Sequence, residues 1–213
     1  MKENLSKEDL VRVMLSLADD MIAAKDRLTE LDAIIGDGDL GVTMVLGFQA
    51  VKESLANPTS LSLQEVFKRS GMGFADKAAS TFGTLTATMF MKAGDVLKGK
   101  EAIGAAEFAA MLRAAAEGVQ KRGKAREGDK TILDALIPAA AAAEEGAGAG
   151  KPLSACLKGA LEAAQRGAEN TVKMRSSAGR ATHFGDRTIG VKDAGAAAFE
   201  LMLKSVARTV QSL

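Results

Sequence analysis

Apolar residues recur along most of this chain at the three- and four-residue spacing of one helix face. After Ser6, a residue type favoured at helix N-caps, comes Asp9 three residues later and then a regular apolar stripe. This stripe and two others contain Leu10, Met14, Leu17 and Met21; Phe108, Met111, Leu112, Ala115 and Val119; and Phe199, Met202, Leu203, Val206 and Val210. We expect all three to face a shared core.

Glycine, proline and polar clusters divide the chain into about eight predicted helices. These span 6–30, 41–56, 61–79, 82–98, 105–122, 130–146, 152–176 and 193–211. The Thr and Phe content of segment 80–91 would also suit a strand, but no β-branched cluster offers it a partner. Abundant alanine and short connections therefore predict an all-α fold, an antiparallel eight-helix up-and-down barrel or bundle.

Composition narrows the class of protein further. The 213 residues, 47% of them hydrophobic, fit a single domain spanning 1–213 that needs no disulfides. The balance of 28 Lys and Arg against 27 Asp and Glu predicts no general attraction to nucleic acid or membranes. No signal-peptide core follows the first charges and no membrane-length apolar run occurs, so we expect a cytoplasmic protein. The lone Cys156 lies in a helical pattern and is expected to be a buried structural thiol.

Three loops, at 31–43, 122–131 and 177–195, carry unusual polar chemistry. In the predicted order they follow the first, fifth and seventh helices. Connections after odd-numbered helices emerge at the same end of an up-and-down arrangement. We therefore expect the three loops to form one composite site.

The first loop lies in "LDAIIGDGDLGVTM" at 31–44, where Gly36, Gly38 and Gly41 have the spacing of a dinucleotide-binding loop. A Rossmann loop follows a buried strand, whereas this one follows a helical pattern and has carboxylates in its gaps. An EF-hand is excluded as well, because the position that requires a bidentate Glu is Phe48.

What remains in this loop is a group of three aspartates, Asp32, Asp37 and Asp39, around two glycines. Glycines let the backbone turn tightly enough for the carboxylates to converge, and hard oxygen ligands suit Mg²⁺. The alternative is that Asp37 and Asp39 only cap the following helix. Three carboxylates in eight residues favour a metal site, and the next helix N-terminus near Gly41 to Thr43 would offer N–H groups to a phosphate.

The second loop, "RGKAREGDKT" at 122–131, differs from a P-loop by one inserted residue before Lys130. It also lacks a preceding strand, so a basic, solvated helix end with Thr131 or Asp129 as the next cap is an equal alternative. The third loop, "SSAGRATHFGDRTIGVKDAGA" at 176–196, is long, as functional loops often are.

Two arginines of the third loop, Arg180 and Arg187, are candidate phosphate clamps. Asp193 could be a helix cap. His183 is the only histidine, so a multi-histidine zinc site is excluded, and we interpret it as an ordinary loop residue.

Together, "LDAIIGDGDLG" at 31–41, "RGKAREGDKTILDAL" at 122–136 and "GRATHFGDRTIGVKDAGA" at 179–196 resemble the motifs of the nucleotide-binding L subunit, or Dak2-type domain, of the dihydroxyacetone kinase family. The resemblance covers essentially the whole chain. It implies an eight-helix antiparallel barrel with ADP or ATP at one end. It also implies a separate K-type subunit that holds a small hydroxyketone.

The resemblance further implies roles for individual residues. Asp32, Asp37 and Asp39 would bind two Mg²⁺ ions, and Asp37, Asp39 and Arg180 would be catalytic. The nucleotide pocket would be lined by Leu40, Gly41, Val42, Thr43, Ser80, Thr81, Phe82, Gly83, Gly123, Ile132, Arg180, Asp193, Ala194 and Gly195.

This chain departs from the family pattern at three places. Leu40 stands where the family usually has His, "ASTF" at 79–82 replaces Gly-Gly-Ala-Ser, and "DAG" at 193–195 replaces Asp-Pro-Gly. The phosphoryl donor implied is either exchanging ATP or a phosphotransferase-system protein that rephosphorylates bound ADP. A noncatalytic nucleotide sensor that binds a regulator is the alternative function.

Overall fold

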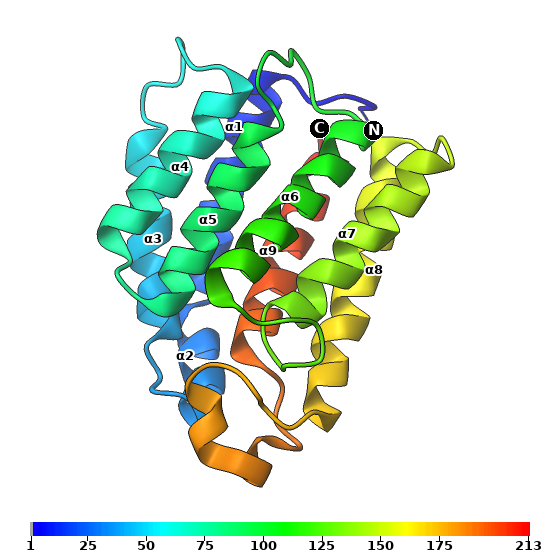
Figure 1. Cartoon of the computed structure of the whole chain (residues 1–213). Coiled ribbons are helices and arrows are strands. Elements are labelled where there is room, and N and C mark those ends of the chain that lie inside the picture. Colours follow the sequence, from blue (N-terminus) through cyan, green and yellow to red (C-terminus); the bar gives the residue numbers. More distant parts are fainter. Residues whose placement is uncertain (1) are drawn as a thin grey trace.

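The computed structural model describes residues 2–213, and these form helices joined by short connections (Figure 1). The α-helices are α1 (Lys7–Ala23), α2 (Lys25–Ile35), α3 (Leu40–Ser54), α4 (Leu63–Lys77), α5 (Thr81–Asp95), α6 (Ala105–Gly123), α7 (Leu133–Gly148), α8 (Leu153–Asn170) and α9 (Ala194–Gln211), with 3₁₀-helices η1 (Thr171–Lys173) and η2 (Arg180–Thr188). Within residues 2–213 the only β-type pairing is an isolated bridge between Leu5 and Ile103. The all-α prediction is confirmed.

Eight of these helices form a closed ring. Going round it, α1 packs against α3, then each of α3 to α8 packs against the next, and α9 packs against both α8 and α1. The predicted eight-helix up-and-down barrel is confirmed. Helix α2 lies outside the ring. It continues the chain from α1 beyond a break and packs against α3 and η2.

The structure differs from the predicted helices in several places. The helix expected at 6–30 is two helices separated at Ala24, where no Gly or Pro signals a break; packing of α2 against α3 produces it. The helix expected at 152–176 ends at Asn170 and is followed by η1, and η2 forms within the segment expected to be loop. Helix α7 spans Leu133–Gly148, which agrees with the predicted 130–146 to within three residues at each end.

Local signals explain where several helices begin. Ser6 and Asp9 form a reciprocal capping box at the start of α1, as the sequence predicted. Ser80 accepts a hydrogen bond from the Gly83 N–H, so segment 80–91 starts a helix and not a strand. The Asp193 side chain caps α9 by accepting from the Ala196 N–H at 2.7 Å.

The apolar stripes fill the barrel. Most stripe residues are buried, and Leu112 and Val206 pack against the core while partly exposed. Phe48, Phe74 and Phe90 meet edge to face, with ring centroids 5.3 to 6.1 Å apart. Cys156 is buried within this core, and burial raises the pKa of its thiol, consistent with a structural role.

The connections α2–α3, α4–α5, α6–α7 and α8–α9 all lie at one end of the barrel, the lower end in Figure 1. This arrangement confirms the expected convergence of the three polar loops and adds the α4–α5 connection to them. Across residues 2–213, no helix combines the length and apolar character required to cross a bilayer.

Two glycines of α8 make a matched test of helix packing. A Cβ at Gly167 would lie 2.0 Å from the Asp134 carbonyl oxygen of α7, whereas a Cβ at Gly159 would meet nothing within 4 Å. We predict that Gly167→Ala lowers the free energy of unfolding by about 1–3 kcal/mol through overpacking. Gly159→Ala should raise it by about 0.5–1 kcal/mol through helix propensity. Urea denaturation of both variants measures this, and equal stabilities would contradict the packing explanation.

Candidate functional site

A cavity of about 410 Å³ opens at the end of the barrel where the polar loops converge. It is lined by Asp32, Ile35, Gly36, Asp37, Asp39, Leu40, Ser80, Thr81, Phe82, Leu85, Lys130, Thr131, Ile132, Ala178, Gly179, Arg180, Ala181, His183, Asp193, Ala194 and Gly195. Carboxylates lie on one side, and Phe82, Leu85 and Ile132 add apolar surface. A polar ligand with an apolar part fits such a lining.

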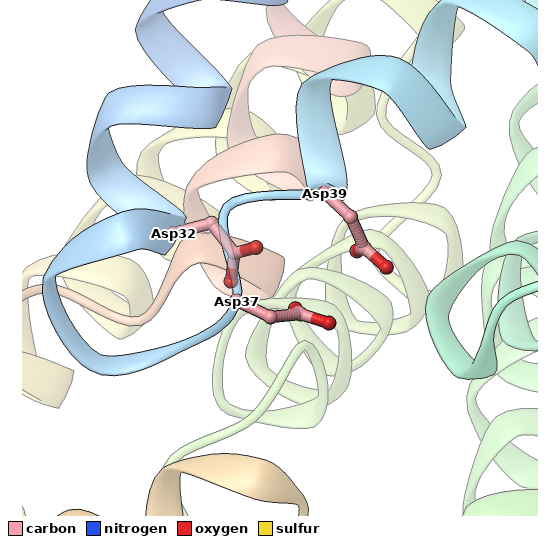
Figure 2. A group of neighbouring side chains, drawn as sticks. All are labelled: Asp32, Asp37 and Asp39. Atoms are coloured by element: carbon pink, nitrogen blue, oxygen red, sulfur yellow. The ribbon is translucent and has the colours of Figure 1, made fainter.

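The three aspartates come together as the sequence predicted. Asp32 lies in the last turns of α2, Asp37 in the following turn, and Asp39 immediately before α3 (Figure 2). One carboxylate oxygen from each lies within 4.8 Å of the others. Three convergent oxygen ligands are a donor set that suits a hard divalent cation such as Mg²⁺.

Two glycines shape the turn that carries these carboxylates. A Cβ at Gly36 would lie 2.3 Å from Asp32 Oδ1, and Gly38 has a φ of +72°, which side chains rarely adopt. The Leu40 N–H donates to Asp32 Oδ2 at 3.3 Å. The glycines therefore permit the turn to fold tightly around Asp32.

The alternative that Asp37 and Asp39 only cap α3 does not fit the geometry. Asp39 occupies the N-cap position, but its side chain makes no capping hydrogen bond. Burial and the neighbouring Asp32 carboxylate instead raise the pKa of Asp39 above its ordinary value. A carboxylate whose ionised form is disfavoured in this way would gain from a cation at the cluster.

A cationic side chain from another loop reaches the same cluster. The Arg180 guanidinium, at the start of η2, forms an ion pair with the Asp37 carboxylate. The second candidate clamp, Arg187, is exposed, outside the cavity lining, with its guanidinium 5.1 Å from the Phe184 ring centroid. Of the two arginines, only Arg180 is placed to meet a ligand in the cavity.

The loop between α6 and α7 is not a P-loop. The alternative of a basic, solvated helix end is confirmed, because Lys121, Arg122 and Lys124 at the end of α6 are exposed. The Thr131 hydroxyl also accepts from the Leu133 N–H at the start of α7, at 3.2 Å. The N–H groups of Gly128 and Thr131 donate to the two carboxylate oxygens of the buried Asp134, at 2.6 and 2.7 Å. These groups are therefore occupied within the protein and do not form a phosphate cradle. Lys130 is also buried, with its ammonium on backbone carbonyls of the α8–α9 connection.

Five predicted nucleotide-binding residues lie outside the cavity lining: Gly41, Val42, Thr43, Gly83 and Gly123. Gly41 and Gly83 are instead positions of close packing. A Cβ at Gly41 would lie 2.2 Å from the Lys25 carbonyl oxygen, and a Cβ at Gly83 would lie 2.0 Å from the Ala78 carbonyl oxygen. Val42 is exposed, and Thr43 is buried behind the wall.

The remaining predicted site residues line the cavity, together with others that the sequence did not single out as ligand-binding. His183, read from the sequence as an ordinary loop residue, is an exposed side chain of η2 at the cavity. Leu85 belongs to the first turns of α5, beside the predicted wall residue Phe82. Each lies three residues, about one helical turn, after a predicted site residue, so a search one turn beyond Phe82 and Arg180 would have identified them.

Comparison with known proteins identifies the family of this chain. The DAK2 domain family matches residues 34–208. The ADP-binding subunit DhaL of the PEP-dependent dihydroxyacetone kinase from Escherichia coli K12 is 30% identical over 204 residues, 96% of this chain and 97% of that protein. The corresponding subunit of kinase 2 from Listeria innocua is 34% identical over 80% of each chain.

Solved structures show the same fold. The dihydroxyacetone kinase of C. freundii matches 93% of this chain and 34% of its own, with a TM-score of 0.72 and 25% identity. Its complex with AMP-PNP and Mg²⁺ matches with a TM-score of 0.69 and 24% identity. The chain therefore belongs to the DAK2 domain family, as a DhaL-type member of the dihydroxyacetone kinase family.

Asp193 at the cavity gives a test of electrostatics that needs no ligand. Burial raises the pKa of its carboxyl from 3.8 to about 7, the Ala196 N–H opposes this shift, and Asp134 adds to it. Between these two pKa values the folded protein holds a proton that the unfolded chain has lost. The free energy of unfolding contributed by this group therefore falls as pH rises from about 4 to about 7.

We predict that Asp193→Asn, which keeps the capping oxygen without the charge, removes this decline. Relative to wild type, the variant should gain stability between about pH 5 and about pH 8, by at least about 1 kcal/mol. Urea denaturation at both pH values checks the difference. A constant difference between the two proteins would contradict the raised pKa.

Proposed function

We propose that this chain is the nucleotide- and magnesium-binding component of a dihydroxyacetone-type kinase. In this function it transfers a phosphoryl group to a small hydroxyketone that a separate K-type subunit holds. The observation that carries the proposal is the convergence of three carboxylates and Arg180 on one cavity at the end of the barrel. The ADP-binding subunits that this chain resembles over most of their length support it.

We propose that the site takes two Mg²⁺ ions with ADP or ATP. Asp32, Asp37 and Asp39 would hold the metal, which when bound neutralises the charge of the phosphates. The apolar wall at Phe82, Leu85 and Ile132 would receive the less polar part of the nucleotide.

The protein groups act by position and charge. Phosphoryl transfer requires little covalent chemistry from the protein, so a nucleophilic side chain is not needed. We propose that Asp37 and Asp39 are catalytic through the metal they hold, and Arg180 through its cationic charge near the phosphates. The acceptor hydroxyl comes from the hydroxyketone on the K-type subunit.

Asp37→Ala tests the metal site directly. We predict that it weakens magnesium-dependent ADP binding by about 100-fold or more, since it removes an anionic ligand from the cluster. Asp95→Ala is the matched control, because Asp95 is an exposed carboxylate at the opposite end of α5. Isothermal titration calorimetry with and without Mg²⁺ measures both, and unchanged affinity in a folded Asp37 variant would contradict the assignment.

The phosphoryl donor can be identified from the bound nucleotide. If ADP is a resident cofactor that a phosphotransferase-system protein rephosphorylates, mass spectrometry will detect it after extensive dialysis. If ATP exchanges in each turnover, the nucleotide will be lost and ATP alone will support activity with a K-type subunit and a panel of ketoses. Tight nucleotide binding without activity with any K-type subunit and either donor would contradict the kinase and favour the noncatalytic sensor.

A further inference from the structure

Lys130 has an unusual environment for a lysine. Its residue surface is only 1% exposed, and its backbone φ is +61°, in the left-handed region that side chains rarely adopt. Its Nζ lies within hydrogen-bonding distance of four backbone carbonyl oxygens. These belong to Thr171 at 2.7 Å, Met174 at 3.1 Å, Thr188 at 2.6 Å and Val191 at 2.5 Å.

The four carbonyls have a simple relation in the chain. We call residues 171–193, which connect α8 to α9, the strap; it is the orange segment at the lower end of Figure 1. Its first leg, the residues that follow α8, includes Thr171 and Met174. Its second leg, the residues that lead into α9, includes Thr188 and Val191. One ammonium group from a different loop therefore holds both legs of the strap together.

Other contacts join the same segments. The Gly190 N–H donates to the Val172 carbonyl oxygen at 2.7 Å, which links the two legs. Ser177 Oγ donates to Asp129 Oδ1 at 2.7 Å, which links the strap to the residue before Lys130. The two legs are thus joined to each other at the base of the strap, near α8 and α9. The tip of the strap, η2, extends to the cavity and carries Arg180.

The charge of Lys130 suits this position. Burial lowers the pKa of its ammonium, and the Asp193 and Asp134 carboxylates oppose that shift. Four converging carbonyl oxygens favour the charged, three-donor form. Without the ammonium, these four carbonyl oxygens would share no donor and would repel one another. Separation of the two legs would relieve that repulsion.

We propose that Lys130 is a positioning residue for Arg180. Its ammonium clamps the two legs of the strap and so holds Arg180 against the aspartate cluster, and it does not contact the phosphates. The clamp is a property of the ligand-free protein. Its effect on nucleotide affinity rests on the proposed function.

The first experiment measures the clamp without any ligand. Lys130→Met keeps the length of the side chain and removes the ammonium, and Lys173→Met is the control, because Lys173 is an exposed lysine of the same strap. In hydrogen-exchange mass spectrometry we expect strap peptides of the Lys130 variant to exchange at least about tenfold faster, with peptides of α5 unchanged. Strap exchange equal to that of wild type would overturn the proposal.

The second experiment asks whether Lys130 acts through Arg180. We expect Lys130→Met and Arg180→Ala each to weaken Mg²⁺-dependent ADP binding by about tenfold, and the double variant to be no weaker than Arg180→Ala alone. A merely structural role for Lys130 would make the two losses multiply, and that result would overturn the positioning role. Absence of nucleotide binding in the wild type would contradict the proposed function and leave the exchange experiment as the test of the clamp.

A second variant covers the case in which Lys130→Met does not fold. Lys130→Gln retains two donors at a shorter reach. Its strap should exchange faster than that of wild type, with the ring helices still protected. Exchange at the wild-type rate would overturn the proposal.

Discussion

Alternation of direction around the ring of helices is the constraint on which the rest of this structure depends. Because each helix of the ring reverses the one before it, every second connection emerges at the same end. Segments more than a hundred residues apart, such as the turn at Asp37 and the start of η2 at Arg180, meet there for that reason. The apolar stripes stabilise the ring, and the polar loops are free to carry the chemistry.

At this end the structure brings like charges together. The turn at Gly36 and Gly38 allows three carboxylates to converge, although their mutual repulsion opposes it. Arg180 balances only one of these charges, through its ion pair with Asp37. A cluster of like charges that the backbone enforces is typical of a binding site, where a ligand supplies the remaining opposite charge. The absence of a side-chain cap from Asp39 is informative here, because a purely structural aspartate in that position would make one.

The sequence predicted the features that depend on local pattern. Stripes such as Leu10 to Met21 indicated which faces are buried, and Asp32, Asp37 and Asp39 are close in sequence, so their convergence required only a tight turn. The sequence did not predict the break at Ala24, because tertiary packing and not a local signal produces it. It also did not predict that the Val42 and Thr43 side chains lie outside the cavity lining, since the rotation of α3 about its axis decides which side chains face the cavity. The environment of Lys130 could not be predicted, because it depends on the path of a segment some forty to sixty residues away.

Two of the cationic contacts of the strap, those of Arg180 and Lys130, differ in how they respond to ionic strength. Arg180 and Asp37 have side chains that are 65% and 40% exposed, so dissolved salt screens their attraction. The Lys130 ammonium is enclosed by protein, where salt has little effect. As salt concentration rises, the tip of the strap therefore loses its electrostatic attachment while its base remains closed. The attachment of the strap at its tip is thus sensitive to salt, whereas the attachment at its base is not.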